Sequence, residues 1–177
     1  MLDFFRVYRE RRPAAHFLFV TPFGEATIRS EASRRGIEDA VIVRSAGRDQ
    51  VPHWVGAADL GIMFVRPGWA KLAASPTKLG EMLAIGLPVI ANSGVGDVAD
   101  VLKQSGAGIA IEAFDPVAYR AAIDAVDRLD KSPEKIREGA RRWFDLRSGT
   151  ESYSAIYRRL SLRSRQRAAV GRRTGLR

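Results

Sequence analysis

Apolar and polar positions alternate along the chain in blocks that predict strands and helices in turn. Short apolar runs, each ended by a turn or a charged residue, are typical of strands. They cover residues 16–21, 40–44, 60–65, 87–91 and 108–111. The blocks between them repeat apolar residues every three or four positions, as amphipathic helices do. Because strands and helices alternate without a repeat of fixed period, we expect an α/β fold with a doubly wound parallel sheet of about five strands.

Proline, glycine and aspartate mark the ends of the expected helices. Asp115 followed by Pro116 is typical of a helix start, and Gly86 is typical of a helix end. The longer helices are expected over residues 2–12, 25–35, 76–85, 95–104, 115–129, 134–145 and 151–160, and a short one begins at Val51. The apolar side chains of the last helix are spaced to pack back on the domain; they are Tyr153, Ile156, Tyr157 and Leu160.

Residues 75–97 read SPTKLGEMLAIGLPVIANSGVGD and carry the clearest chemistry. Ser75 suits the N-cap and Pro76 the first helical position, so the N–H groups of Thr77, Lys78 and Leu79 are expected to lack intrahelical acceptors. Such a helix end attracts anions through its macrodipole. With the Lys78 ammonium beside it, the segment predicts a phosphate or diphosphate site.

The same stretch resembles a family signature. Residues 75–79, then Glu81, then residues 83–90 resemble the donor-binding signature of retaining glycosyltransferases of the two-Rossmann-domain GT-B class, glycosyl transferases group 1, and a looser likeness covers residues 16–160. The resemblance implies that Glu81 binds the ribose hydroxyls of a nucleotide sugar and that the helix start holds its diphosphate. A carboxylate suits this role because it can accept both protons of a cis-diol.

The resemblance also implies roles for two loops at the carboxyl ends of strands. It places Arg44 and Ser45 near the nucleotide base, and Ser93, Gly94 and Gly96 near the sugar or phosphate. In one respect the chain departs from the family, because Ala73 stands where a second glutamate usually touches the sugar.

Each of these features has a plainer interpretation. Lys78 and Glu81 can form a solvated surface pair, the glycines can form an ordinary turn, and Arg44 with Ser45 can lie in a common exposed loop. Trp69, in the loop before the phosphate helix, is expected to pack, with a place at the sugar pocket as the alternative.

The net charge of +9 belongs to one end of the chain. Eight of the 29 basic residues follow Tyr157 and no acidic residue follows Glu151, so the remaining 21 basic residues nearly balance the 20 acidic ones. We therefore expect a domain over residues 1–160, a basic and disordered tail over 161–177, and no specific nucleic-acid partner. The alternative for the tail is peripheral contact with anionic lipids.

Cofactor chemistry is not indicated. The chain has no cysteine and only two histidines, His16 and His53, which lie far apart in sequence, so we expect no metal site and no cofactor. No apolar run approaches the roughly 20 residues that span a bilayer, and no signal peptide is recognisable. We expect a cytoplasmic protein, peripheral to the inner face of the membrane if the tail binds lipids.

The sequence therefore predicts the donor-binding half of a glycosyltransferase, which takes a nucleoside-diphosphate sugar and relies on a separate acceptor domain or subunit. The alternative is a non-catalytic nucleotide-sugar-binding or scaffold module, and a hexosamine epimerase is weaker because its catalytic acids and histidine cannot be placed. The resemblance further implies that the first central strand of the family is missing between residues 16–21 and 60–65. We expect the isolated chain to be inactive as a transferase.

Overall fold

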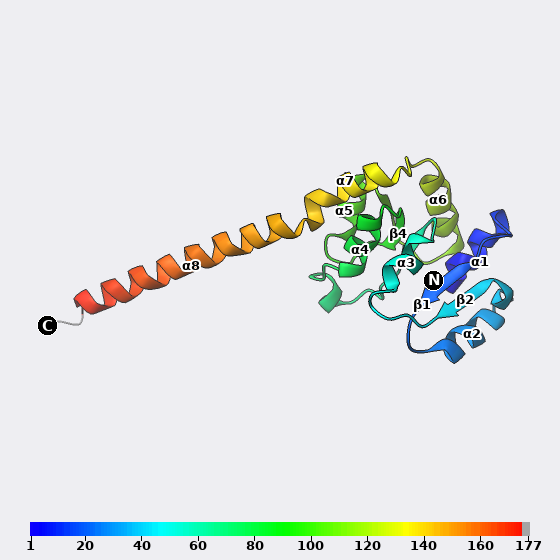
Figure 1. Ribbon diagram of the computed structural model, residues 1–177, viewed down its shortest axis with the longest axis horizontal. Coiled ribbons are helices and arrows are strands. Elements are labelled where there is room, and N and C mark those ends of the chain that lie inside the picture. Colours follow the sequence, from blue (N-terminus) through cyan, green and yellow to red (C-terminus); the bar gives the residue numbers. More distant parts are fainter. Residues whose placement is uncertain (175–177) are drawn as a thin grey trace. The chain divides into compact units, whose positions relative to one another are not determined.

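The computed structural model describes the backbone of residues 1–174 and the side chains of residues 1–161 (Figure 1). The chain divides into two compact units, Met1–Trp143 and Phe144–Arg177. Within the described residues, all strands belong to the first unit: β1 (Phe17–Val20), β2 (Val41–Arg44), β3 (Gly61–Met63), β4 (Val89–Asn92) and β5 (Gly108–Ile111). All five lie within one or two residues of the predicted runs.

The strands pair in parallel, as predicted, but they form two sheets. β1 pairs with β2, and β3, β4 and β5 form a second sheet in that order. The prediction of one five-stranded sheet is therefore wrong. The two sheets are separate because residues 1–174 place no strand between β1 and β3. Each of these two strands therefore has one unpaired edge.

One helix packs on both sheets. In α1 (Leu2–Arg11), Phe4 and Val7 join a core with β4, β5 and α6 (Pro116–Asp127), whereas Phe5 joins a separate core with β2 and α2 (Glu25–Ser33). Figure 1 shows α1 between α6 and the β1–β2 pair. α1 thus fixes how the two sheets stand to each other.

The opposite face of the larger sheet is covered by α4 (Thr77–Ile85) and α5 (Val98–Ser105), and α3 (Val51–Gly56) contacts α4. With helices on both faces, all four residues of β4 are buried. This is the doubly wound arrangement that the sequence predicts, and it leaves the carboxyl ends of the strands as the open edge.

Short segments complete the first unit. Two 3-10 turns, η1 (Glu38–Ala40) and η2 (Trp69–Lys71), precede β2 and α4. The Asp115 carboxylate accepts from the Ala118 amide at 2.9 Å, which confirms the predicted cap of α6. α7 (Pro133–Phe144) follows α6, and its Arg137 side chain donates to the Ile85 carbonyl at the end of α4, 2.9 Å away.

The second unit is α8 (Leu146–Thr174), which is much longer than the predicted helix over 151–160. Its helical backbone runs on over residues 161–174, and the division at residue 160 with a disordered tail stays a prediction. The packing of Tyr153, Ile156, Tyr157 and Leu160 on the first unit stays a prediction. Side chains from residue 162 onward lie outside the described part, so the lipid role of the basic end stays a prediction. Among the described residues, no helix combines the length and apolarity that crossing a membrane needs.

Candidate functional site

The segment before α4 and the turn after β4 pack together at the carboxyl edge of the larger sheet. The Gly96 amide donates to the Lys71 carbonyl at 2.9 Å, and a side chain at Gly96 would begin 1.8 Å from the Ala74 carbonyl oxygen. Only glycine permits this approach, which also uses a φ of +44°. The structure therefore brings the predicted phosphate helix and the Ser93–Gly96 turn to one place.

The start of α4 differs in detail from its prediction. Pro76, not Ser75, is the N-cap, and the Leu79 amide donates back to the Pro76 carbonyl at 3.1 Å. The expectation that Leu79 offers a free N–H group is therefore wrong, because a tight first turn uses it. The amides of Thr77 and Lys78 have no acceptor among the described residues and face outward from the positive end of a nine-residue helix.

Lys78 and Glu81 form an exposed ion pair. The Lys78 ammonium donates to a Glu81 carboxylate oxygen at 2.9 Å, and the two side chains are 71% and 54% exposed. An exposed pair of this kind contributes less than about 1 kcal/mol to stability. It can therefore open at little cost, and both groups remain accessible from solvent.

Asn92 is a structural residue of the site that the sequence analysis missed. It is 3% exposed, accepts from the Val65 amide at 2.7 Å and donates to the Ser93 carbonyl at 2.9 Å. The side chain thus ties the ends of β3 and β4 together and holds the start of the turn. The sequence contained one signal for this role, a single polar residue at the end of an apolar strand.

Arg44 and Ser45 lie apart from the other candidates. They are exposed at the carboxyl end of β2 in the smaller sheet, and the Arg44 guanidinium donates to the Val43 carbonyl at 3.0 Å. Trp69 is 92% exposed, so the expectation that it packs is wrong, and its indole is accessible beside Lys71.

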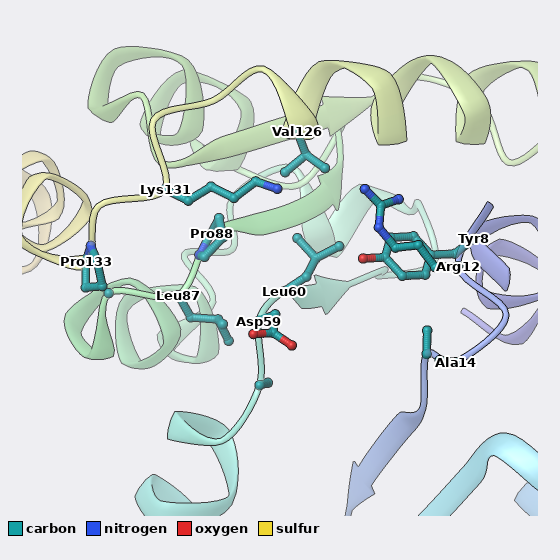
Figure 2. A pocket seen from close by; sticks show the side chains of 13 residues that line it. Tyr8, Arg12, Ala14, Asp59, Leu60, Leu87, Pro88, Val126, Lys131 and Pro133 are labelled. Carbon is teal, nitrogen blue, oxygen red and sulfur yellow. The ribbon is translucent and has the colours of Figure 1, made fainter.

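Two cavities of the first unit lie elsewhere. One of about 630 Å³ opens at the amino ends of β1, β3 and β4; Figure 2 shows Tyr8 and Arg12 on one side of it and Leu60, Leu87 and Pro88 across from them. The other, of about 610 Å³, lies between β1 and β3 and includes Arg44 in its wall. Neither is lined by Thr77, Lys78, Glu81 or the Ser93–Gly96 turn, so the candidate phosphate site lies outside both cavities.

Two basic groups at the first cavity, Arg12 and Lys131, are paired with Asp127. The Arg12 guanidinium hydrogen-bonds the Asp127 carboxylate at 2.6 Å, and this bond lowers the pKa of Asp127. Arg12 also lies 4.8 Å from the centre of the Tyr8 ring, whose hydroxyl has its pKa raised by burial. Within the described residues no group of three acidic or histidine side chains that could hold a metal ion occurs.

The sequence matches the profile of a known protein family. The family profile described as glycosyl transferases group 1 matches residues 2–127. No curated protein matches the chain in sequence.

Solved structures with a similar fold include AviGT4, a glycosyltransferase involved in avilamycin A biosynthesis (TM-score 0.64, 20% identity, covering 82% of this chain and 42% of that one). WaaG, a glycosyltransferase involved in lipopolysaccharide biosynthesis, is similar at a TM-score of 0.60 and 21% identity, covering 82% of this chain and 38% of that one. Sucrose-phosphate synthase from Thermosynechococcus elongatus is similar at 0.68 and 17%, covering 91% and 42%. The chain therefore spans about 40% of the length of these proteins, which corresponds to one domain.

Proposed function

The chain belongs to the glycosyl transferases group 1 family, and from this membership we propose that residues 1–143 bind a nucleoside-diphosphate sugar as the donor half of a glycosyltransferase. The observation that carries the proposal is the start of α4. Two unbonded amides, the Lys78 ammonium and the Glu81 carboxylate lie there within about one helical turn, at the open carboxyl edge of the parallel strands.

The diphosphate occupies the helix start in this proposal. The amides of Thr77 and Lys78 donate to its oxygens, and the helix macrodipole and the ammonium balance its charge. As the sugar departs, negative charge on the diphosphate leaving group increases. Donors already fixed by the fold then stabilise the transition state more than the ground state, without a metal ion.

The ion pair between Lys78 and Glu81 would open when the donor binds. Lys78 then turns to the diphosphate, and Glu81 accepts the two ribose hydroxyl protons. The low cost of breaking an exposed pair supports this exchange. Arg44 and Ser45 would contact the base, although they belong to the smaller sheet, and Ser93, Gly94 and Gly96 would face the sugar or phosphate.

Ala73 favours a second candidate, a non-catalytic module that binds a nucleotide sugar. The methyl group of Ala73 is exposed and offers no hydrogen bond to a sugar hydroxyl where the family usually has a carboxylate. In either case, an acceptor would be supplied by a separate domain or subunit. Incubation with a complementary acceptor-domain subunit and labelled donors distinguishes the transferase from the binding module, because transfer of sugar excludes a protein that only binds.

Calorimetric titration with uridine, guanosine and adenosine diphosphates tests the proposed site. We expect one of them to bind the wild type, and Glu81→Ala to weaken that binding by about tenfold, or 1.4 kcal/mol, through loss of the ribose hydrogen bonds. Glu25→Ala is the matched control, because Glu25 is also an exposed helical carboxylate paired with a basic residue, Arg29. Equal affinities of Glu81→Ala and wild type would remove the ribose role.

A further inference from the structure

α8 carries an apolar stripe along its first half. The side chains of the stripe recur at intervals of three, four or seven residues, which places them on one face of an α-helix. They are Leu146, Tyr153, Ile156, Tyr157 and Leu160. A rise of about 1.5 Å per residue makes the stripe about 20 Å long. Because a single helix cannot cover its own face, only another molecule or another part of the chain can cover the stripe.

The acidic groups of the second unit lie at the start of α8. The Asp145 carboxylate accepts from the Ser148 amide at 2.7 Å, in the manner of an N-cap. The Arg147 guanidinium donates to the Glu151 carboxylate at 3.1 Å, one turn further on, so these two charges balance each other. No acidic residue follows Glu151 in the sequence. From residue 152 onward the chain therefore carries only positive charge.

Two arginines flank the stripe within the described residues. A rotation of about 100° per residue places Arg158 and Arg159 on opposite sides of the stripe. Neither has an acidic residue within four positions, so neither can form an ion pair along the helix. Six more arginines follow Ser161, and their side chains lie outside the described part of the chain. The eight arginines together give residues 158–177 a net charge of +8.

A partner of this helix must match both its charge and its apolar stripe. Residues 1–157 carry 21 basic and 20 acidic groups, so the rest of the chain offers no opposite net charge. A second copy carries the same positive charge and is repelled. A nucleic acid matches the charge but offers little apolar surface to Ile156 and Leu160. An anionic lipid surface matches both, with acidic headgroups for the arginines and acyl chains for the stripe.

The residue types of the stripe suit the depth at which a surface-bound helix lies. Tyr153 and Tyr157 each combine an apolar ring with a polar hydroxyl, and such side chains favour the boundary between acyl chains and headgroups. Ile156 and Leu160 are wholly apolar and suit the outer part of the acyl region. The opposite face is polar and includes Ser148, so it suits water. Arginine stems are long enough to lie along apolar surface while the guanidinium reaches the headgroups.

We propose that α8 binds the surface of a membrane that contains acidic phospholipids. The helix lies in the plane of that surface, with the apolar stripe toward the acyl chains and the arginines among the headgroups. Apolar burial and charge act together in this binding, and either one alone gives only weak attachment. The proposal does not depend on donor binding, since it uses no residue of α4 or of the Ser93–Gly96 turn.

Vesicle flotation of the full chain tests this proposal, with vesicles of phosphatidylcholine alone and of phosphatidylcholine mixed with phosphatidylserine. We expect binding to the mixed vesicles to be about tenfold tighter or more, and to weaken by about tenfold or more between about 0.1 M and about 1 M salt. The stripe variant Ile156→Ser/Leu160→Ser keeps every charge and should weaken this binding about tenfold, because it removes apolar surface from the acyl region. Ala155→Ser, on the opposite face of α8, is the matched control and should bind as the wild type does.

Equal binding to both kinds of vesicle, or binding to neither, would overturn the proposal. Unchanged binding of the stripe variant would also overturn it, because the arginines alone would then hold the chain at the surface. If the stripe variant does not fold, Arg158→Gln/Arg159→Gln takes its place, and it should weaken binding to the mixed vesicles about tenfold. Self-association of the wild type without vesicle binding would assign the stripe to a second copy and would overturn the proposal.

Discussion

A side chain at Gly96 would collide with the Ala74 carbonyl, whereas one at Gly94 would meet nothing within 4 Å. Both glycines have positive φ, +44° and +75°. Gly94→Ala should therefore cost about 1 kcal/mol of unfolding free energy from backbone strain alone. Gly96→Ala should cost about 2 kcal/mol or more, because the turn must also move away from the α4 segment.

Urea unfolding of the two variants measures this difference. A smaller loss for Gly96→Ala than for Gly94→Ala would mean that the turn and the segment before α4 do not pack as described.

Single residues also show what the sequence could and could not predict. The Ser-Pro pair located the start of α4 to within one residue, since proline is compatible only with the first turn. The sequence could not show that the Leu79 amide donates to the Pro76 carbonyl, because this hydrogen bond depends on how tightly the first turn of α4 is wound. The role of Asn92 was hidden because its partner Val65 is distant in sequence.

At the scale of elements, three ion pairs tie α1 and the residue after it to their neighbours: Asp3 with Arg35, Arg9 with Asp39 and Arg12 with Asp127. Hydrogen bonds from Arg35, Arg9 and Arg12, respectively, lower the pKa of these carboxyls from the ordinary value of 3.8. A lowered folded-state pKa adds stability above the unfolded value, and this stability is lost as the pH falls through the folded pKa. We expect Tm to change little from pH 7 to 5 through these groups and to fall below about pH 4.

Thermal unfolding followed between pH 7 and 2.5 tests this expectation, with Asp127→Asn as the variant that should weaken the acid dependence. The change should be modest, because all three carboxyls are partly exposed to solvent. A Tm that rises on acidification would contradict the assignment of these pairs.

Elements were predictable where local pattern decides them. The run Gly108–Ile111 was located without error, and the Asp115 cap was recognised from two residues. For α8 the local pattern decides less. Tyr153, Ile156, Tyr157 and Leu160 share one face of this helix, but periodicity shows only that a face exists and not what covers it.

At the scale of the whole molecule, the split between the sheets depends on long-range arrangement. The five apolar runs could be read from the sequence, whereas their pairing depends on whether a strand fills the place between β1 and β3. The single predicted sheet is therefore not found, and the strands divide into sheets of two and three.

We expect the isolated chain to bind its donor weakly and to transfer no sugar. The chain spans about 40% of the glycosyltransferases that it resembles in fold, and an acceptor half would lie outside that share. Incubation of the purified 177-residue chain with labelled nucleotide sugars measures this. Robust turnover by the chain alone would contradict it and would place an acceptor site within these residues.

The most direct test of the donor-site proposal is an amide NMR titration of the ¹⁵N-labelled chain with uridine, guanosine and adenosine diphosphates. If the start of α4 binds the diphosphate, the amides of Thr77, Lys78, Gly94 and Gly96 should shift together and saturate with one affinity, because they surround the same open edge. The amides of Leu18 and Ile62, beside the cavity between β1 and β3, should keep their chemical shifts. Saturable shifts confined to that cavity, or no shift at Thr77 and Lys78 with any of the three nucleotides, would contradict the account.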